Sequence, residues 1–507
     1  MKIGRRKVFM HGGVFAAGTI ASNLTGMEAL AQGTTPPLRQ SLEGLAWNDP
    51  IVASYRDAVG ILMSAKTGTL PYNWVTLSQI HGTNPNEYHF CPHGDWYFLP
   101  WHRAYTVTYE DIVRKVTNNP AFAMPYWDWT ANPLMPEVFL SPKTPDGKTN
   151  WLYYARRTWP PATPMPAEVV GPDVLAEALS PTDYEQFGTS RNPDQTDLNP
   201  SWVPAGGGTQ GVLEGTPHNL VHNNIGGWMP SASSPRDPIF FMHHSNIDRI
   251  WAVWNLNNQN SSDPLWTGMP FTDNFVKPDG TSWSPKVSDL YVPETLGYTY
   301  GLGGLPVASV AGNTMALRNQ MTSLFALPKA ATSRPANIVT ATAPNTATAR
   351  QGQPLNVLVT VPDAKLTEIG KRKPLGSGTA MMNFAAVRES AATGTRAIGF
   401  IRDVQVTGSA GTMYRVFIDK DNLTAATPIT DPHYVGTFGV FDHGTHGTHK
   451  PPSFALDLTA AIRRVYGAGK VPNGRLRVQI LPVGTANAGA PVGTATPARI
   501  EVTFVTV

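Results

Sequence analysis

The chain contains a single cysteine, Cys91, among its 507 residues. A disulfide framework within the chain is therefore excluded, whichever compartment the protein occupies. A lone thiol is either buried and inert or committed to chemistry, and its neighbours in the sequence decide between these interpretations.

Charged residues are also scarce, at 15% of the chain, whereas an average soluble protein has about 25%. The net charge of +3 comes from the first 31 residues, and the remainder holds 35 basic and 35 acidic residues. This balance argues against binding of nucleic acid through a basic face. No stretch approaches about 18 uninterrupted apolar residues, so the sequence predicts no membrane span.

Residues 1–31 have the pattern of a targeting segment. Arg5 and Arg6 precede a mildly apolar run, and the segment ends in the small-x-small sequence Ala29–Ala31. The paired arginines and the weak hydrophobicity resemble a twin-arginine export signal. We expect export by that machinery to the periplasm or the medium.

The residue pattern of residues 32–300 predicts a mainly helical domain with long loops. Apolar residues recur there at spacings of three and four, which is typical of buried helix faces. The residues between 134 and 211 are rich in Pro, Gly, Asn and Asp and predict extended loops with short elements. The predicted helices are Pro50–Ser64, Trp101–Val116, Pro217–Asn223 and Ile239–Asn257.

The residue pattern changes after a Gly/Ala/Pro-rich linker, residues 301–336. This linker contains one short amphipathic segment, Met315–Phe325. Residues 337–507 form short β-branched runs separated by turn residues, a pattern typical of an all-β antiparallel sandwich. One helix is expected in this domain, Phe454–Tyr466. The predicted strands are Ile338–Ala343, Leu355–Val361, Ala397–Val406, Met413–Ile418, Tyr434–Val440, Leu476–Pro482 and Ile500–Val507.

Eight of the 13 histidines fall in two clusters, and the second cluster is built around a four-residue spacing. His218 and His222 lie on one face of a helix at that spacing, close enough to hold one ion. A zinc protease needs Glu directly after the first His, and Asn219 stands there instead. His243 or His244, on the next helix, can supply a third ligand. Asp248, four residues after His244, is expected to accept the ring proton of that histidine.

In the first cluster, His93 and His102 lie nine residues apart, about 13.5 Å along one straight helix, which is too far for a shared ion. Pro100 favours a helix that begins near Trp101, so that His93 lies on a loop that folds back. His81 completes a second set of three, with His89 as a competitor. Two sets of three neutral imidazoles suit copper or zinc better than magnesium, calcium or manganese.

Three segments then identify the family that the chain resembles. Residues 93–110 (HGDWYFLPWHRAYTVTYE) resemble the first copper signature of tyrosinases, and residues 237–249 (DPIFFMHHSNIDR) resemble the second. Residues 296–300 (LGYTY) resemble the tyrosine motif that closes the central domain of plant and fungal members. The likeness is to bacterial polyphenol oxidases of this family, and it covers about residues 40–300.

This resemblance implies a pair of copper ions inside a four-helix bundle, with six histidines as ligands. His81, His93 and His102 would hold one copper ion. His218, His222 and His244 would hold the other, which leaves His243 as a packed neighbour of the site. In some members of the family, a cysteine placed like Cys91 forms a thioether with the ligand that matches His93.

The resemblance also implies a reaction, the oxidation of phenols by dioxygen. A tyrosinase hydroxylates monophenols and oxidises o-diphenols to o-quinones. Glu214 and Asn219 match the residues that hold a water for monophenol deprotonation, and Ser231 lies near the position of a residue at the substrate entrance. The C-terminal domain is expected to cover the copper site, and assembly into a homo-oligomer is left open.

Three other functions compatible with the same motifs stay open. A catechol oxidase or an o-aminophenol oxidase would lack the monophenol reaction. A hemocyanin-like carrier would bind oxygen reversibly. The presence of Glu214 and Asn219 favours the enzyme.

Overall fold

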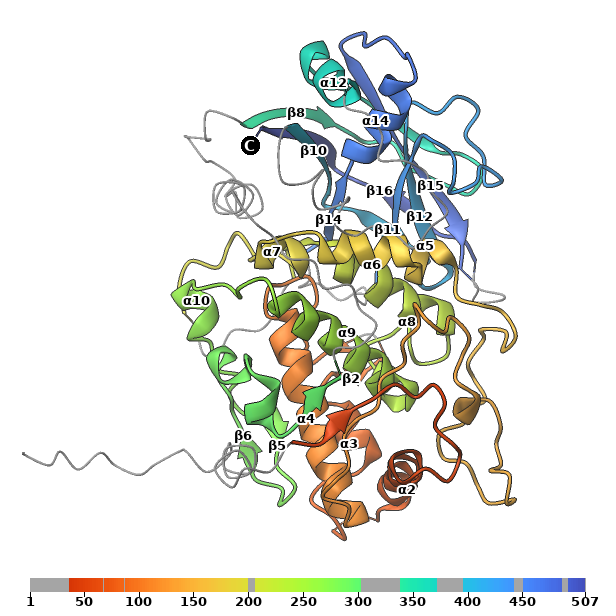
Figure 1. Cartoon of the computed structure of the whole chain (residues 1–507), viewed down its shortest axis with the longest axis vertical. Helices are drawn as coiled ribbons and strands as arrows, with labels where there is room; N and C mark the ends of the chain where they lie inside the picture. Colours follow the sequence, from red (N-terminus) through yellow and green to blue (C-terminus); the bar gives the residue numbers. More distant parts are fainter. Residues whose placement is uncertain are drawn as a thin grey trace, which may run out of the picture.

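The computed structural model describes residues 36–66, 68–85, 87–198, 206–301, 338–371, 395–441, 450–485 and 491–506. A helical region ends at residue 301, and a β-rich region begins at residue 338 (Figure 1). This order of a helical and a β-rich region agrees with the prediction. The predicted export segment, the short piece Met315–Phe325 and all of the predicted linker except Gly301 lie outside the described residues.

The helical region combines three long helices with many short ones, and α5, α6 and α7 form a layer between it and the β-rich region (Figure 1). The helices are α2 (Pro50–Ser64), α3 (Trp74–Ser78), α4 (Phe98–Thr117), α5 (Ala167–Val170), α6 (Pro172–Leu179), α7 (Tyr184–Phe187), α8 (Asn219–Ile225), α9 (Ile239–Asn255), α10 (Pro264–Thr267), α12 (Asp363–Gly370) and α14 (Thr459–Gly467). Shorter helical turns are η1 (Glu137–Phe139), η2 (Glu214–His218), η3 (Ser234–Arg236), η4 (Val287–Leu290), η5 (Pro293–Leu296) and η6 (Ser409–Gly411), of which η2 is a π-helical turn.

Helix α4 begins at Phe98, three residues earlier than predicted. Pro100 lies inside its first turn, where the missing N–H costs nothing because the first N–H groups of a helix have no partner within it. Asp95 starts the turn, since its backbone carbonyl accepts from Phe98 N and its side chain accepts from Tyr97 N. His93 therefore lies on a loop before the helix, as predicted.

The core of the helical region is continuous and aromatic. Helix α9 is buried along nearly its whole length and packs against α4, which in turn contacts α2. Trp101 and Trp251 are fully buried in this core. A close-packed interior of this kind holds side chains in fixed rotamers, which is what a precise ligand arrangement requires.

The β-rich region contains two larger sheets, in the strand orders β4-β14-β10-β17-β8 and β13-β12-β15-β9. Buried side chains of both sheets belong to one apolar cluster, and within each sheet the C-terminal strands pair antiparallel. The strands of the chain are β1 (Leu38–Arg39), β2 (Gly82–Asn84), β3 (Glu87–Tyr88), β4 (Thr209–Gln210), β5 (Phe275–Val276), β6 (Ser282–Trp283), β7 (Thr299–Tyr300), β8 (Ile338–Pro344), β9 (Leu355–Thr360), β10 (Thr395–Arg402), β11 (Gln405–Thr407), β12 (Thr412–Ile418), β13 (Tyr434–Phe438), β14 (Ser453–Asp457), β15 (Arg475–Gly484), β16 (Thr494–Thr496) and β17 (Arg499–Thr506).

Two expectations about the β-rich region are wrong. The predicted helix Phe454–Tyr466 is a strand, β14, followed by the helix α14, because Phe454 and Leu456 alternate into the core beside β10. The single predicted strand Ala397–Val406 is two strands, since Asp403 adopts a left-handed backbone conformation, with φ 51°, and breaks the run. Helix α12 was not predicted.

The two regions share a sheet as well as an interface. Strand β4 belongs to the helical region in the sequence, yet it pairs in parallel with β14 at the edge of the five-stranded sheet. A buried ion pair joins Arg415 of β12 to Glu168 of α5, with the nearest atoms 2.6 Å apart. The β-rich region is therefore built onto the helical region through backbone pairing.

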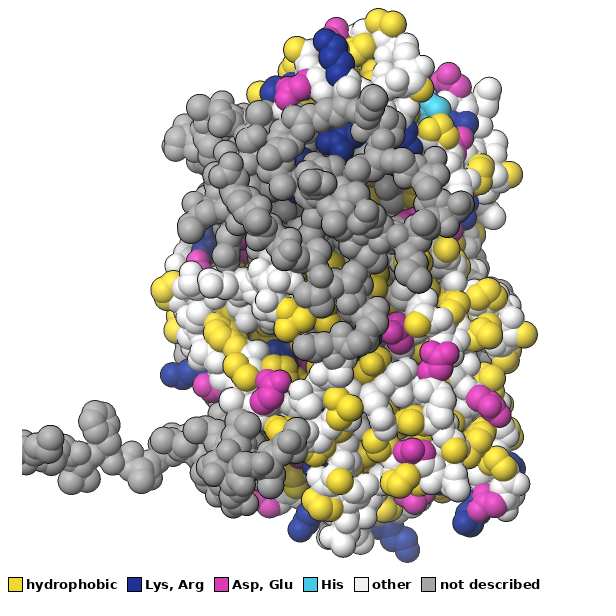
Figure 2. All heavy atoms as spheres, viewed as in Figure 1, with side chains coloured by type: hydrophobic (Ala, Val, Ile, Leu, Met, Phe, Trp, Pro, Cys, Tyr) yellow, Lys and Arg dark blue, Asp and Glu magenta, His cyan; other side chains and the backbone are white. Residues whose placement is uncertain are grey.

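On the face shown in Figure 2, basic and acidic side chains of the described residues are interspersed. This distribution is what the balanced composition predicts. Among the helices that the structure describes, none has the length and apolar character needed to cross a membrane.

Candidate metal centre

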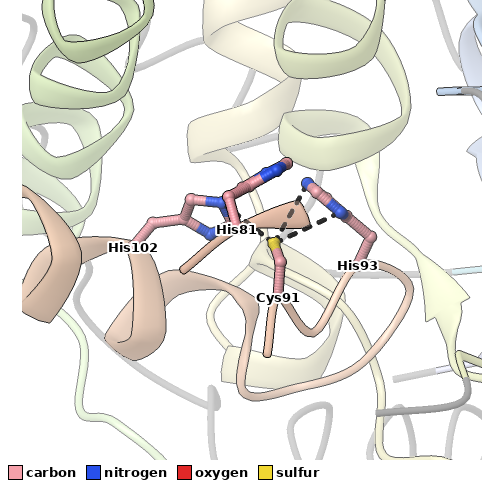
Figure 3. Close-up of side chains that lie close together, drawn as sticks. All are labelled: His81, Cys91, His93 and His102. Carbon is pink, nitrogen blue, oxygen red and sulfur yellow. Dashed lines mark hydrogen bonds between the residues drawn. The ribbon is translucent and has the colours of Figure 1, made fainter. Parts of the chain in front are cut away.

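Two groups of buried side chains come together in the helical region, and each group could hold a metal ion. Within each group, the potential ligand atoms all lie within 4.8 Å of one another. The first group is drawn in Figure 3, with His81 after α3, Cys91 and His93 on the loop before α4, and His102 on α4. The second group contains His218, His222, His243 and His244, from η2, α8 and α9.

In the first group, the backbone orients the imidazole rings. His81 Nδ1 lies 2.6 Å from the carbonyl of Ala232, and His102 Nδ1 lies 2.8 Å from the carbonyl of Phe98. A carbonyl only accepts, so each Nδ1 carries the proton and each Nε2 keeps a lone pair for a metal. His89 is exposed and bound to the carbonyl of Gln79, outside the group, so it is not the third member.

The second group follows the same rule. His222 Nδ1 lies 2.7 Å from the carbonyl of Met229, and His218 Nδ1 lies 2.8 Å from Asn219 Oδ1. The Nε2 atoms of His222 and His244 lie 3.2 Å apart, so both rings point at a common position.

His243 differs from its neighbour His244 in its hydrogen bond. The indole N–H of Trp129 donates to His243 Nδ1 over 3.2 Å. Because an indole nitrogen can only donate, His243 Nδ1 accepts, and the neutral ring carries its proton on Nε2. His243 therefore lies beside the group with no lone pair on Nε2.

The two groups lie against each other. The rings of His102 and His244 stack with centroids 4.3 Å apart, and those of His93 and His218 are 5.4 Å apart. Burial lowers the pKa of His81 to about 3, and it also lowers the pKa values of His102 and His218 well below 6.5. These three imidazoles are therefore neutral at physiological pH and can donate electron pairs.

These residues fit a pair of copper ions. The Nε2 atoms of His81 and His218 are buried and make no hydrogen bond. A buried polar atom without a partner costs free energy. A bound metal ion would remove this cost, because it would take up the free lone pair of each Nε2 atom. Neutral nitrogen donors without carboxylates suit copper.

The expectation that Asp248 accepts the ring proton of His244 is wrong. Asp248 belongs to a buried ionic network, in which its carboxylate oxygens accept from two arginines and two tyrosines. His244 Nδ1 makes no hydrogen bond. The donors to Asp248 are Arg39, Arg103, Tyr298 and Tyr300, at 2.5 to 3.0 Å.

Glu214 and Asn219 are both fully buried next to the second group. Glu214 Oε1 accepts from the backbone N–H of Gly94 over 2.7 Å, and Oε2 accepts from the hydroxyl of Thr189. Burial raises the pKa of Glu214 to about 8, although these two donors oppose the rise. Ser231 is partly exposed and donates to the carbonyl of Trp228. It directly precedes Ala232, whose carbonyl orients His81.

One residue of the site, Phe441, was not predicted; it comes from the β-rich region and its ring contacts rings of both groups. Its ring centroid lies 4.5 Å from that of His222 and 4.8 Å from that of His93. The side chain is fully buried. Phe441 follows a strand in an ordinary apolar run, and nothing in that run distinguishes it from a core residue.

Cys91 lies at the edge of the His93 ring. Its Sγ atom is 3.3 Å from Nδ1 and 3.6 Å from Nε2, so it faces the ring carbon between the two nitrogens. The same sulfur lies 3.3 Å from Nε2 of His102 (Figure 3). Burial raises the pKa of the thiol, so it is protonated at neutral pH.

A helical region with two adjacent triads of neutral imidazoles defines the class of type 3 copper proteins. Comparison with known proteins agrees, since residues 71–257 match the family model described as the common central domain of tyrosinase. Residues 71–257 thus match the central domain of the tyrosinase family, whose members use two copper ions.

Individual relatives support the same family. A tyrosinase of Hahella sp. (strain CCB-MM4) is 31% identical over 240 residues, which is 43% of this chain and 48% of that protein. A chloroplastic polyphenol oxidase of Malus domestica is 30% identical over 236 residues, 41% of this chain and 38% of that protein. The matched regions thus span at most about half of these relatives.

Solved structures share the fold over most of the chain. The latent form of an aurone synthase (polyphenol oxidase) superposes with a TM-score of 0.60 at 18% identity, over 93% of this chain and 90% of that one. Latent apple tyrosinase superposes with a TM-score of 0.61 at 18% identity, over 93% and 98%. The likeness at this identity concerns the fold alone.

Proposed function

We propose that the protein uses two copper ions and dioxygen to hydroxylate monophenols and to oxidise o-diphenols to o-quinones. The observation that carries this proposal is the pair of adjacent, buried imidazole triads, in which backbone carbonyls orient the rings of His81, His102 and His222. His81, His93 and His102 bind one ion. His218, His222 and His244 bind the other, in a helical core that we interpret as a four-helix bundle beside a β-sandwich.

When bound, the copper pair supplies the electrons that reduce dioxygen and the Lewis acidity that holds a phenolate. The protein supplies the rest. Its carbonyl-bound rings keep both ions in place without rearrangement, and the aromatic core around them excludes water. Neutral ligands suit a metal that changes oxidation state, since they add no charge that would favour one state strongly.

Access to this site requires movement of Phe441, because its ring occupies the space that faces both triads. We therefore propose that the chain as described is a latent form. A phenol ring has the same shape as the Phe441 side chain and would take its place. Ser231, partly exposed near His81, is proposed to lie at the entrance.

Monophenols pose a further problem, because a phenol with a pKa of ~10 is protonated at neutral pH. Glu214 is proposed to accept that proton through a water held by Asn219, as a carboxylate that the positive charge of the bound copper ions would favour against the effect of burial. Glu214→Gln removes the acceptor and keeps the shape, so we expect monophenol hydroxylation to fall about 100-fold while diphenol oxidation changes little. Oxygen consumption with 4-methylphenol and with 4-methylcatechol measures the two reactions.

The control for this prediction is Glu185→Gln, which changes another buried carboxyl, one that accepts from the backbone N–H of Arg191. It should leave the ratio of the two rates unchanged. An equal fall of both rates in Glu214→Gln would refute the proton-accepting role and favour a structural one.

We also propose that Cys91 and His93 become joined by a thioether. The S–H bond of the thiol and one ring C–H bond break, a C–S bond forms, and dioxygen accepts the two electrons and two protons. The cross-link would fix the His93 ring. We expect intact mass spectrometry to find copper-loaded, aerated protein lighter by two hydrogen atoms, and peptide mapping to find residues 91 and 93 joined.

A matched sample kept free of copper and oxygen should retain the full mass and a thiol that can be alkylated after unfolding. If the protein is first loaded with copper in air and then unfolded, a thiol that is still fully alkylatable would exclude the thioether.

Three alternatives are separated by the same oxygen assay. A catechol oxidase or an o-aminophenol oxidase would consume oxygen only with its own substrate class. A hemocyanin-like carrier would bind oxygen without turning over catechols, even after proteolytic removal of the β-rich region. We further propose that residues 1–31 direct export by the twin-arginine route, to the periplasm or the medium.

A further inference from the structure

The turn of helix that carries two of the ligand histidines also carries two asparagines. His218 is followed by Asn219, and His222 is followed by Asn223. At a spacing of four residues, the histidines share one face of the helix and the asparagines share the neighbouring face. One face therefore points at the copper site, and the other points at the β-rich region.

The β-rich region meets this second face with its backbone, along the segment 437–440. Gly439 N donates to the carbonyl of Gly215 over 2.7 Å. The carbonyls of Gly439 and Val440 accept from the side-chain amides of Asn219 and Asn223, over 2.8 and 3.0 Å. The segment also accepts at the carbonyl of Thr437, from the hydroxyl of Thr216, and it leads directly to Phe441.

The amide of Asn219 has no hydrogen left for any other partner. Its oxygen contacts His218 Nδ1, and its nitrogen donates to Gln210 Oε1 over 2.9 Å and to the carbonyl of Gly439. A carboxamide nitrogen has two hydrogens, and both are used. A water near Glu214 cannot receive a hydrogen bond from Asn219 while Gly439 is docked.

Close approach at Gly439 depends on its lack of a side chain. A Cβ atom at this position would lie 2.4 Å from Cδ2 and 2.7 Å from Cγ of Leu220, a residue buried in α8. An alanine here must push the segment away from the helix, since the neighbouring core is closely packed.

We infer that the backbone carbonyl of Gly439 is a specificity-determining contact: docked on Asn219, it withholds the amide hydrogen that monophenol hydroxylation needs. Phe441 closes the site to all phenols, and Gly439 separately controls which phenols react once the site is open. This inference rests on the proposed function, because it assigns to Asn219 the water-holding role proposed there.

The test compares full-length, copper-loaded variants in which the site is open but the Gly439 contact differs. Phe441→Gly opens the site and leaves Gly439 docked, so 4-methylcatechol is oxidised while 4-methylphenol reacts slowly. Adding Gly439→Ala releases Asn219. We expect the ratio of monophenol to diphenol rates to rise about tenfold in this double variant, as for the gain of one hydrogen bond from Asn219 to the water beside Glu214.

The matched control is Gly436→Ala in the Phe441→Gly background. Gly436 lies in β13, three residues before Gly439, but a Cβ there would approach Leu456 inside the β-rich region, at 3.0 Å. Its rate ratio should equal that of Phe441→Gly alone. An equal ratio in the Gly439→Ala double variant would overturn the inference while leaving the proposed function intact. Absence of monophenol turnover in every variant, with diphenol oxidation retained, would overturn both.

A second readout does not depend on activity. Hydrogen–deuterium exchange of the metal-free chains reports the bond from Gly439 N to the carbonyl of Gly215. Peptides covering residues 437–441 should stay protected in Phe441→Gly and in its Gly436→Ala derivative, and should exchange faster when Gly439→Ala is added. Full protection in the Gly439→Ala variant would show that the segment remains docked, and a raised rate ratio in that protein would then refute the proposed cause.

Discussion

Replacement of His244 by asparagine is expected to reduce the bound copper from two ions to one per chain and to abolish phenol oxidation. His244 Nε2 points at the same position as Nε2 of His222, 3.2 Å away. Asparagine fills the space but offers a much poorer nitrogen donor. With two histidines left, the second site cannot hold its ion, and a single copper cannot perform the two-electron reduction of dioxygen alone.

The adjacent histidine provides the control. His243→Asn should keep two copper ions per chain, because Trp129 donates to His243 Nδ1 and so leaves the proton of the neutral ring on Nε2. As a neighbour of the ligands, it should cost at most about 10–100-fold in copper affinity. Both variants change a fully buried residue, so loss of packing is matched between them.

The measurements are copper content per chain and electron paramagnetic resonance of the oxidised protein. A coupled pair is silent, whereas an isolated cupric ion gives a signal. His244→Asn should give the signal, and His243→Asn should not. The reverse pattern would exchange the two residues in the ligand set, and two intact coupled ions in both variants would refute the second triad.

The second large effect is expected at Asp248, where Asp248→Asn should lower the free energy of unfolding by about 3–5 kcal/mol, since it leaves buried arginines without their counter-charge. Arg39 and Arg103 are fully buried and both pair with this carboxylate. Arg39 also joins β1 to α4 through Glu110, so the network closes the helical region. Urea unfolding monitored by tryptophan fluorescence measures the change.

The pH dependence of this contribution has a definite sign. Burial raises the pKa of Asp248, but Arg103 and Arg39 outweigh burial, and the pKa lies below 3.8 in the folded chain. A lowered pKa stabilises the fold above pH 3.8, and the stabilisation is lost as the pH falls through the folded-state value. The difference between the native protein and Asp248→Asn should therefore shrink in acid.

An exposed ion pair is the control for Asp248. Asp57 pairs with Arg56 at 3.6 Å and its side chain is 62% exposed. Asp57→Asn should change the free energy of unfolding by less than about 1 kcal/mol. A similarly small effect of Asp248→Asn would show that the buried network contributes little to stability.

The histidines show how far local patterns reach. The four-residue spacing of His218 and His222 follows from helix geometry, and both rings do reach one group. The break before α4 was predicted from Pro100 because His93 and His102 cannot share an ion on one straight helix. Its position was wrong by three residues, since a proline is tolerated anywhere that an N–H has no partner.

The wrong predictions arise where a residue finds its partner in a distant segment of the chain. Asp248 was assigned to His244 because the two lie on one helix face, but Arg39 and Arg103 compete for it from elsewhere in the chain. Residues 454–466 have apolar spacings that suit both a helix and a strand. Pairing with β10 decided in favour of a strand for the first part.

What the sequence determined by itself was the chemistry: the number of imidazoles, their grouping, the absence of other strong ligands and the single thiol beside one of them. These properties are local, because spacing along a helix or loop is set by backbone geometry. Only the tertiary structure decided which ring nitrogen is free, that Trp129 donates to His243 and not to His244, and that Phe441 and Gly439 pack against the site. Those outcomes depend on which donors, acceptors and apolar surfaces meet across hundreds of residues, and packing selects them for the chain as a whole.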